Sequence, residues 1–94
     1  MSLSVIIPVL NEEAEIVDVL TALAPLRARG VETIVVDGGS SDRTVTLAAP
    51  LADRVLVPSE HIAEAYARHG TPADRIQVVP YAADTRRFTP RVEK

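Results

Sequence analysis

Two short runs of β-branched residues decide the fold: LSVIIPV at residues 3–9 and TIVVD at residues 33–37. Both read as strands of a parallel sheet, and the first has the apolar run of a strand buried on both faces. Residues 54–57 and 76–79 repeat the pattern more briefly. Three amphipathic stretches with the apolar spacing of helices separate these strands. They are residues 11–24, 40–48 and 59–69.

Local signals mark where these helices begin and end. Asn11 is the predicted N-cap of the first helix, Ser40 or Ser41 of the second, and Ser59 of the third. Pro25 is expected to end or bend the first helix near its last apolar turn. The connections are therefore short, as in a chain that alternates strands and helices.

The β-α-β-α-β-α-β order predicts an α/β fold, a small three-layer Rossmann-like domain with a four-stranded parallel sheet. We expect the second strand beside the first and the third beside the second. The fourth strand lies either outside the third or on the free side of the first. We favour the strand order 3-2-1-4, because it makes a doubly wound sheet with a switch point. Residues 1–94 contain no linker, which predicts a single domain.

Composition excludes several classes of function. The chain has 94 residues and a formal net charge of -3, which argues against nucleic acid or an anionic membrane as a partner. No apolar run is long enough for a bilayer, and Met1–Leu3 lacks the basic region of a secretory signal. With no cysteine, the chain has no disulfide or thiolate metal site. We expect a cytoplasmic protein that is a monomer or a weak homodimer.

Polar residues gather where the predicted strands end. They are residues 8–12, 37–42 and 59–61, at the edge where parallel sheets bind ligands. The first turn has no glycine, so neither a dinucleotide fingerprint nor a Walker loop is present. Asp37 ends a buried strand at this edge, and that position favours a functional carboxylate over a structural one. By itself, Gly38–Gly39 favours a tight turn over a binding loop.

The other polar candidates favour structural explanations. Asp42 fits a first-turn residue that complements the helix dipole. His61 and His69 have no carboxylate four residues before or after them, so we predict no metal site. Arg86 and Arg87 suit a solvated tail over residues 81–94 better than a phosphate clamp, with Phe88 as its packing residue.

The segments SVIIPVLNEE (4–13) and IVVDGGSSDRT (34–44) together resemble the N-terminal part of family-2 glycosyltransferases, enzymes of A-type fold that use nucleotide sugars. The similarity runs over residues 2–56. It implies that Pro8 and Glu12 border a nucleotide site, and we expect Asp37 and Gly38 to line the same pocket. It also implies that Asp37 contacts the base or ribose of a uridine or related nucleotide, a contact that a carboxylate can make as a hydrogen-bond acceptor. Mg²⁺ or Mn²⁺ with a UDP- or GDP-sugar would be the cofactor and donor.

The rest of the chain departs from that family. No D-x-D metal motif occurs in the 94 residues, and no catalytic base can be assigned. Residues 52–90 are similar instead to the end of the N-terminal domain in family-4 glycosyltransferases of B-type fold. This resemblance predicts a chimera, engineered more plausibly than natural, with a junction at residues 52–59. The alternative is a single family-2 relative whose second half has diverged.

Three functions follow for comparison. The first is a domain that binds a nucleotide or nucleotide sugar weakly, with a dissociation constant on the order of 0.1–1 mM, and that transfers no sugar by itself. The second is a fold-only scaffold with no ligand. The third is a phosphoacceptor or hydrolase that uses Asp37 as nucleophile. It is disfavoured because no second acid ends a neighbouring strand and Lys94 is the sole lysine.

Overall fold

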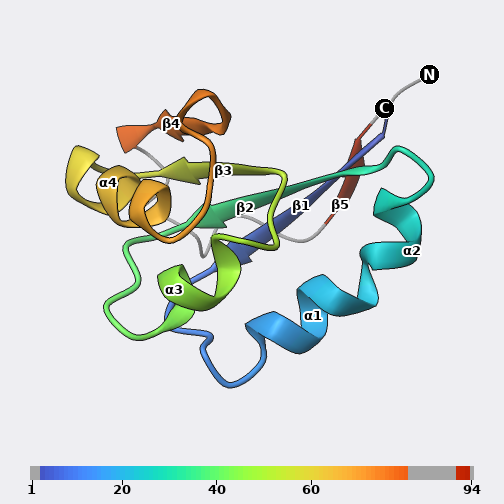
Figure 1. Ribbon diagram of the computed structural model, residues 1–94, viewed down its shortest axis with the longest axis horizontal. Helices are drawn as coiled ribbons and strands as arrows, with labels where there is room; N and C mark the ends of the chain where they lie inside the picture. Colours follow the sequence, from blue (N-terminus) through green and yellow to red (C-terminus); the bar gives the residue numbers. More distant parts are fainter. Residues whose placement is uncertain (1–2, 81–90, 94) are drawn as a thin grey trace.

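The computed structural model describes residues 3–80 and 91–93, which form one sheet with helices packed against it (Figure 1). The strands are β1 (Ser4–Val9), β2 (Glu32–Asp37), β3 (Arg54–Val57), β4 (Ile76–Val78) and β5 (Arg91–Glu93). The helices are α1 (Ile16–Ala22), α2 (Ala24–Arg27), α3 (Thr44–Ala48) and α4 (Glu60–Arg68), and a 3-10 turn η1 (Ala73–Arg75) precedes β4. The four predicted strands are confirmed to within one residue at each end.

The sheet has the order β4-β3-β2-β1-β5, and β1 to β4 are parallel. The α/β class and the four-stranded parallel sheet are therefore confirmed. The fourth strand lies outside β3, the alternative position, and not beside β1 as the favoured order 3-2-1-4 required. Two contacts explain this. Helix α4 packs on both β3 and β4, so its crossover returns to the adjacent position. The free edge of β1 pairs instead with β5, which is antiparallel to it.

The helices described all lie on one face of the sheet (Figure 1). Each right-handed crossover steps to the next strand in the same direction, and such steps place successive helices on the same side. Helix α3 accordingly packs between α1 and α4. Residues 3–80 and 91–93 thus form two layers, and the third layer expected from sequence is not among them. No helix in residues 3–80 is long and apolar enough to cross a bilayer. Phe88 lies outside the described residues.

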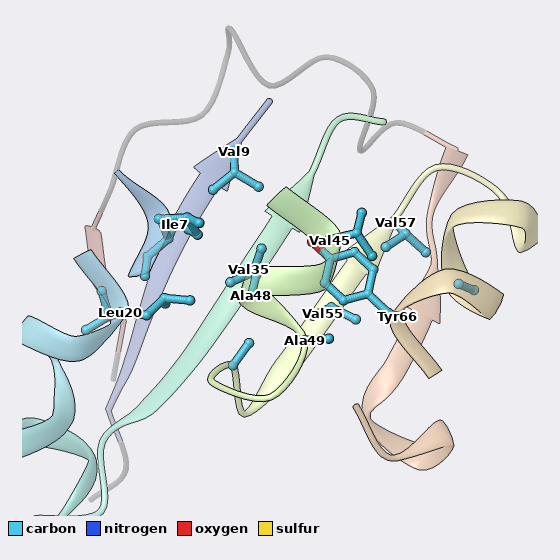
Figure 2. Close-up of a cluster of buried hydrophobic side chains, with 14 residues drawn as sticks. Ile7, Val9, Leu20, Val35, Val45, Ala48, Ala49, Val55, Val57 and Tyr66 are labelled. Atoms are coloured by element: carbon cyan, nitrogen blue, oxygen red, sulfur yellow. The ribbon is translucent and has the colours of Figure 1, made fainter. Parts of the chain in front are cut away.

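The core lies between this helix layer and the sheet (Figure 2). Side chains alternate along β1: Val5, Ile7 and Val9 are buried, whereas the residues between them are only half-buried. The expectation that residues 3–9 are buried on both faces is therefore wrong, because the helices within residues 3–80 cover one face alone. Val35, Val55 and Val57 complete the part of the core that comes from the sheet. The part that comes from the helix layer consists chiefly of Ile16, Leu20, Val45, Ala48, Ala49, Ala63 and Tyr66.

The first helix begins later than the sequence suggests. Asn11 has a φ of 53°, in the left-handed region where asparagine is tolerated, and α1 starts only at Ile16. Asn11 is therefore not an N-cap, because its side chain bonds to a distant loop instead. The break predicted at Pro25 is confirmed: α1 ends at Ala22 and Pro25 lies in the first turn of α2.

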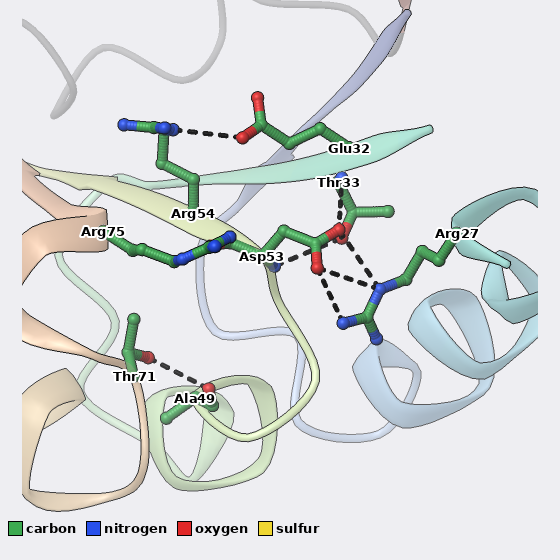
Figure 3. Close-up of polar contacts among 8 residues, drawn as sticks. All are labelled: Arg27, Glu32, Thr33, Ala49, Asp53, Arg54, Thr71 and Arg75. Atoms are coloured by element: carbon green, nitrogen blue, oxygen red, sulfur yellow. Dashed lines mark hydrogen bonds and ion pairs between the residues drawn. The ribbon is translucent and has the colours of Figure 1, made fainter. Parts of the chain in front are cut away.

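A part-buried ion pair joins the amino-terminal edge of the sheet to α2 (Figure 3). The Arg27 guanidinium donates to both carboxylate oxygens of Asp53, with a shortest distance of 2.7 Å. Asp53 also accepts hydrogen bonds from the backbone N–H and the hydroxyl of Thr33. Partial burial alone would raise the pKa of Asp53, but the hydrogen bonds from Arg27 and Thr33 hold it below the ordinary value.

Replacing Asp53 with Asn tests this pair. Asparagine can still accept the Thr33 N–H but leaves the guanidinium without its carboxylate, so we expect a loss of about 1–2 kcal/mol at pH 7. Because the folded-state pKa is lowered, the stabilisation is fully present above the unfolded value of about 4 and is lost as pH falls below it. The acid side of the stability curve should therefore be flatter in the variant, as measured by urea unfolding between pH 2 and pH 7.

Glu32→Gln is the matched control, because Glu32 pairs with Arg54 through side chains that are 31% and 41% exposed. Exposed pairs contribute little, so this change should cost less than about 0.5 kcal/mol. Equal losses in the two variants would contradict the importance given to the Asp53 pair.

Candidate functional site

Hydrogen bonds join the loops that follow β1 and β2 into one platform at the carboxyl edge of the sheet. The N–H of Asn11 donates to the Ser40 hydroxyl at 3.0 Å, and the N–H of Glu12 donates to the Thr44 hydroxyl at 2.8 Å. In return, the Asn11 side-chain oxygen accepts from the N–H of Ser41 at 2.8 Å. Each loop therefore satisfies polar groups of the other, some thirty residues away in the chain.

Asp42 and Gly38 complete the platform. Asp42 accepts from the Thr44 N–H at 2.9 Å at the start of α3, and from the Glu13 N–H at 3.3 Å. Partial burial would raise the pKa of Asp42, but the bonds from Thr44 and Glu13 lower it. Asp42 thus binds the first N–H group of α3, whose N-cap is Arg43, and neither Ser40 nor Ser41 caps this helix. Gly38 donates its N–H to the Val9 carbonyl at 2.9 Å and holds the two loops at the strand ends.

Asp37 lies beneath this platform and is fully buried. Its Oδ1 accepts from the backbone N–H groups of Gly39 at 2.8 Å and Ser40 at 2.7 Å. Its Oδ2 accepts from the hydroxyl of Tyr66 at 2.6 Å. The carboxylate therefore shapes the loop from inside the protein, and both of its oxygens have partners within the chain.

Tyr66 is the buried partner that α4 contributes to this edge. Its side chain is fully buried, and Figure 2 shows the ring within the core in front of β3. Burial, together with the adjacent Asp37 carboxylate, raises the pKa of Tyr66 far above its ordinary value. The phenol is therefore held as the neutral hydrogen-bond donor.

A small pocket opens where β1 meets α1. Its volume is about 220 Å³. Pro8 and Glu12 both line it, so the structure brings these two predicted site residues together. The remaining wall is mostly apolar and consists of Ile7, Val9, Glu15, Ile16 and Val19.

A larger groove of about 410 Å³ lies between α3 and α4. Gly39 to Asp42 form one end of it, and His61 and His69 from α4 line its other side. Within residues 3–80, no three acidic or histidine side chains are placed to hold a metal ion.

The structure therefore separates the four predicted site residues. Pro8 and Glu12 face a pocket, Gly38 lies at the joint of the two loops, and Asp37 is enclosed below them. Sequence reasoning missed Tyr66. Its position on the apolar face of a helix indicated only burial, and nothing in the sequence paired it with Asp37.

Comparison with known proteins gives one family. The model of glycosyl transferase family 2 matches residues 4–78, which is more than half of the chain. The match spans residues 52–59, where the second resemblance placed a junction. No curated protein and no solved structure shows a significant match to the chain.

The raised pKa of Tyr66 predicts a specific sensitivity to alkali. An unfolded tyrosine ionises near pH 10, whereas the folded one stays neutral, so the stabilisation is complete below pH 10 and is lost above it. The loss approaches about 1.4 kcal/mol for each further pH unit. Unfolding free energies of the wild type and Tyr66→Phe should therefore converge between about pH 10 and pH 12. Parallel curves would contradict the assignment.

Proposed function

The chain belongs to glycosyl transferase family 2. From this premise we propose that the carboxyl edge of its sheet binds the nucleoside part of a nucleotide sugar. The observation that carries the proposal is the pocket beside β1, which contains both Pro8 and Glu12. These two residues lie in the segment of the chain that resembles the nucleotide-binding motif of the family. The ligand class is a uridine or guanosine diphosphate sugar.

The chemistry of the pocket suits a nucleoside better than a phosphate. Pro8, Ile7 and Val19 offer apolar surface to a base, and the pocket is small enough to select one planar group. The carboxylates of Glu12 and Glu15 are hydrogen-bond acceptors, complementary to the N–H of a base and the hydroxyls of a ribose. The proposed recognition therefore uses side chains that line this pocket.

The backbone donors of the platform are not free to hold a diphosphate. The N–H groups of Gly39 and Ser40 bind Asp37, and that of Ser41 binds Asn11. The exposed side chains nearby are largely acidic and repel a phosphate. Mg²⁺ or Mn²⁺ would have to neutralise the diphosphate, and the described residues hold no cluster that would fix the ion. Binding is therefore expected to be weak.

We also predict that this chain alone transfers no sugar. Transfer needs a cation or helix dipoles to stabilise the leaving nucleoside diphosphate, and a base to activate the acceptor hydroxyl. The 94 residues contain no D-x-D motif. Asp37 is buried and fully hydrogen-bonded, so it is unsuited to the role of base or phosphoacceptor nucleophile.

Two alternatives differ in what they explain. A fold-only scaffold fits the inward-directed hydrogen bonds of the platform, but it gives no reason for a pocket that contains both Pro8 and Glu12. A chimera with family-4 glycosyltransferases would explain the resemblance over residues 52–90. The match to family 2 extends through residue 78, and this favours a single divergent relative.

Nucleoside titration followed by amide chemical shifts tests the proposed site. We expect uridine to bind with a dissociation constant on the order of 0.1–1 mM and metal-free UDP to bind no more tightly, because its phosphates gain no partner and face acidic side chains. Glu12→Ala should weaken uridine binding about fivefold or more, which corresponds to the loss of one hydrogen bond to a charged group. Shifts should centre on residues 7–19.

Glu64→Ala is the matched control, because Glu64 is an exposed carboxylate on α4 that lines a different groove. The Glu64→Ala variant should bind uridine with the same affinity as the wild type. Metal-free UDP binding at least tenfold tighter than uridine binding would contradict nucleoside recognition and point to a phosphate site.

Incubation of the chain with UDP- and GDP-sugars, Mn²⁺ and polyol acceptors tests the absence of transfer. We expect no product above a blank that contains no protein. Turnover that disappears in Glu12→Ala but persists in Glu64→Ala would overturn this expectation, since it would require a complete active site at the same edge.

A further inference from the structure

A single hydroxyl group connects the third crossover of the fold to the candidate site. Tyr66 is the largest of the fully buried side chains in residues 3–80, and it comes from the last turn of α4. Its hydroxyl lies 2.6 Å from Oδ2 of Asp37, which ends β2. The bond thus joins two elements that are separated by twenty-nine residues.

From Asp37, further hydrogen bonds lead outward to the pocket. The other carboxylate oxygen accepts the N–H groups of Gly39 and Ser40. The Ser40 hydroxyl in turn accepts the N–H of Asn11, the residue before Glu12. Each bond in this sequence fixes the orientation of the group that makes the next one.

The Tyr66 hydroxyl determines how the Asp37 carboxylate is turned. With Oδ2 held by the phenol, Oδ1 is directed at the loop and accepts two N–H groups. Without the phenol, Oδ2 would be a buried acceptor without a donor, which is costly, and the carboxylate would rotate toward solvent. Gly39, whose φ is 107°, would then lose the bond that holds its unusual conformation.

We propose that Tyr66 is a positioning residue for the nucleoside site, acting through Asp37 and Ser40 on the loop that carries Glu12. This inference rests on the proposed function for its ligand, but the part that concerns the loop stands on the hydrogen bonds alone. It also gives Asp37 a role different from the ligand contact that the family resemblance implied. The carboxylate holds the site in shape from below.

Tyr66→Phe removes the hydroxyl and keeps the ring in the core. Thr71→Val is the matched control, because Thr71 is also buried and its hydroxyl also makes one hydrogen bond, to the Ala49 carbonyl at 3.0 Å. Thr71 follows α4 and makes no hydrogen bond to the platform. Both variants lose a buried hydroxyl, so a general loss of stability affects both.

Amide hydrogen exchange gives the first measurement. In Tyr66→Phe, the N–H groups of Gly39, Ser40 and Asn11 should exchange about tenfold faster than in Thr71→Val, after correction for global stability. Equal exchange in Tyr66→Phe and Thr71→Val would overturn the proposal.

Uridine affinity gives the second measurement. If the wild type binds uridine, Tyr66→Phe should weaken binding about three- to tenfold, whereas Thr71→Val should not. Unchanged binding in Tyr66→Phe would overturn the positioning role. If the wild type binds no uridine, the proposed function fails, and the exchange rates still decide whether Tyr66 orders the loop.

Discussion

The buried carboxylate of Asp37 is the constraint on which the carboxyl edge of the sheet depends. A carboxylate without access to water is retained only where donors satisfy its oxygens, and here three donors do so. Two are N–H groups of the loop after β2, and the third is the phenol of Tyr66. The loop, β2 and α4 must therefore be in place together. Helix α4, in the third crossover, is thus coupled to β2 and to the loop that follows it.

Because the polar groups of this edge form hydrogen bonds with one another, few of them remain to bind a ligand. Helix starts and tight turns ordinarily present N–H groups to phosphates, yet here Asn11 and Asp37 accept those of Gly39, Ser40 and Ser41. The groups left for a ligand are carboxylates and apolar surface. Such a site suits the nucleoside that we propose as its ligand, and these three N–H groups are not available to its phosphates.

Local patterns were sufficient for the strands and for some helix ends, but not for contacts across the fold. Ser59 caps α4 as its position before a helical run indicated, because capping involves only neighbouring residues. Asn11 carried the same signal and was misassigned, because its oxygen binds Ser41 thirty residues away. The pairing of Asp37 with Tyr66 is of the same kind. The position of β4 beside β3 depends on which strands α4 packs against. The periodicity of the sequence does not encode that packing.

The singly wound order of the parallel strands has a consequence for where a site can form. No switch point exists among β1 to β4, so the crevice must arise at an edge. The backbone carbonyls of Leu3 and Val9 accept from β2 and from the residue that follows it. Because the backbone groups of successive residues in a strand face opposite neighbours, the backbone of Pro8 faces the β5 side. Described pairing with β5 covers Ser4 to Ile6 only. Proline has no N–H to leave unsatisfied, so β1 can extend past its described pairing with β5, and residues 7–9 of this stretch line the pocket.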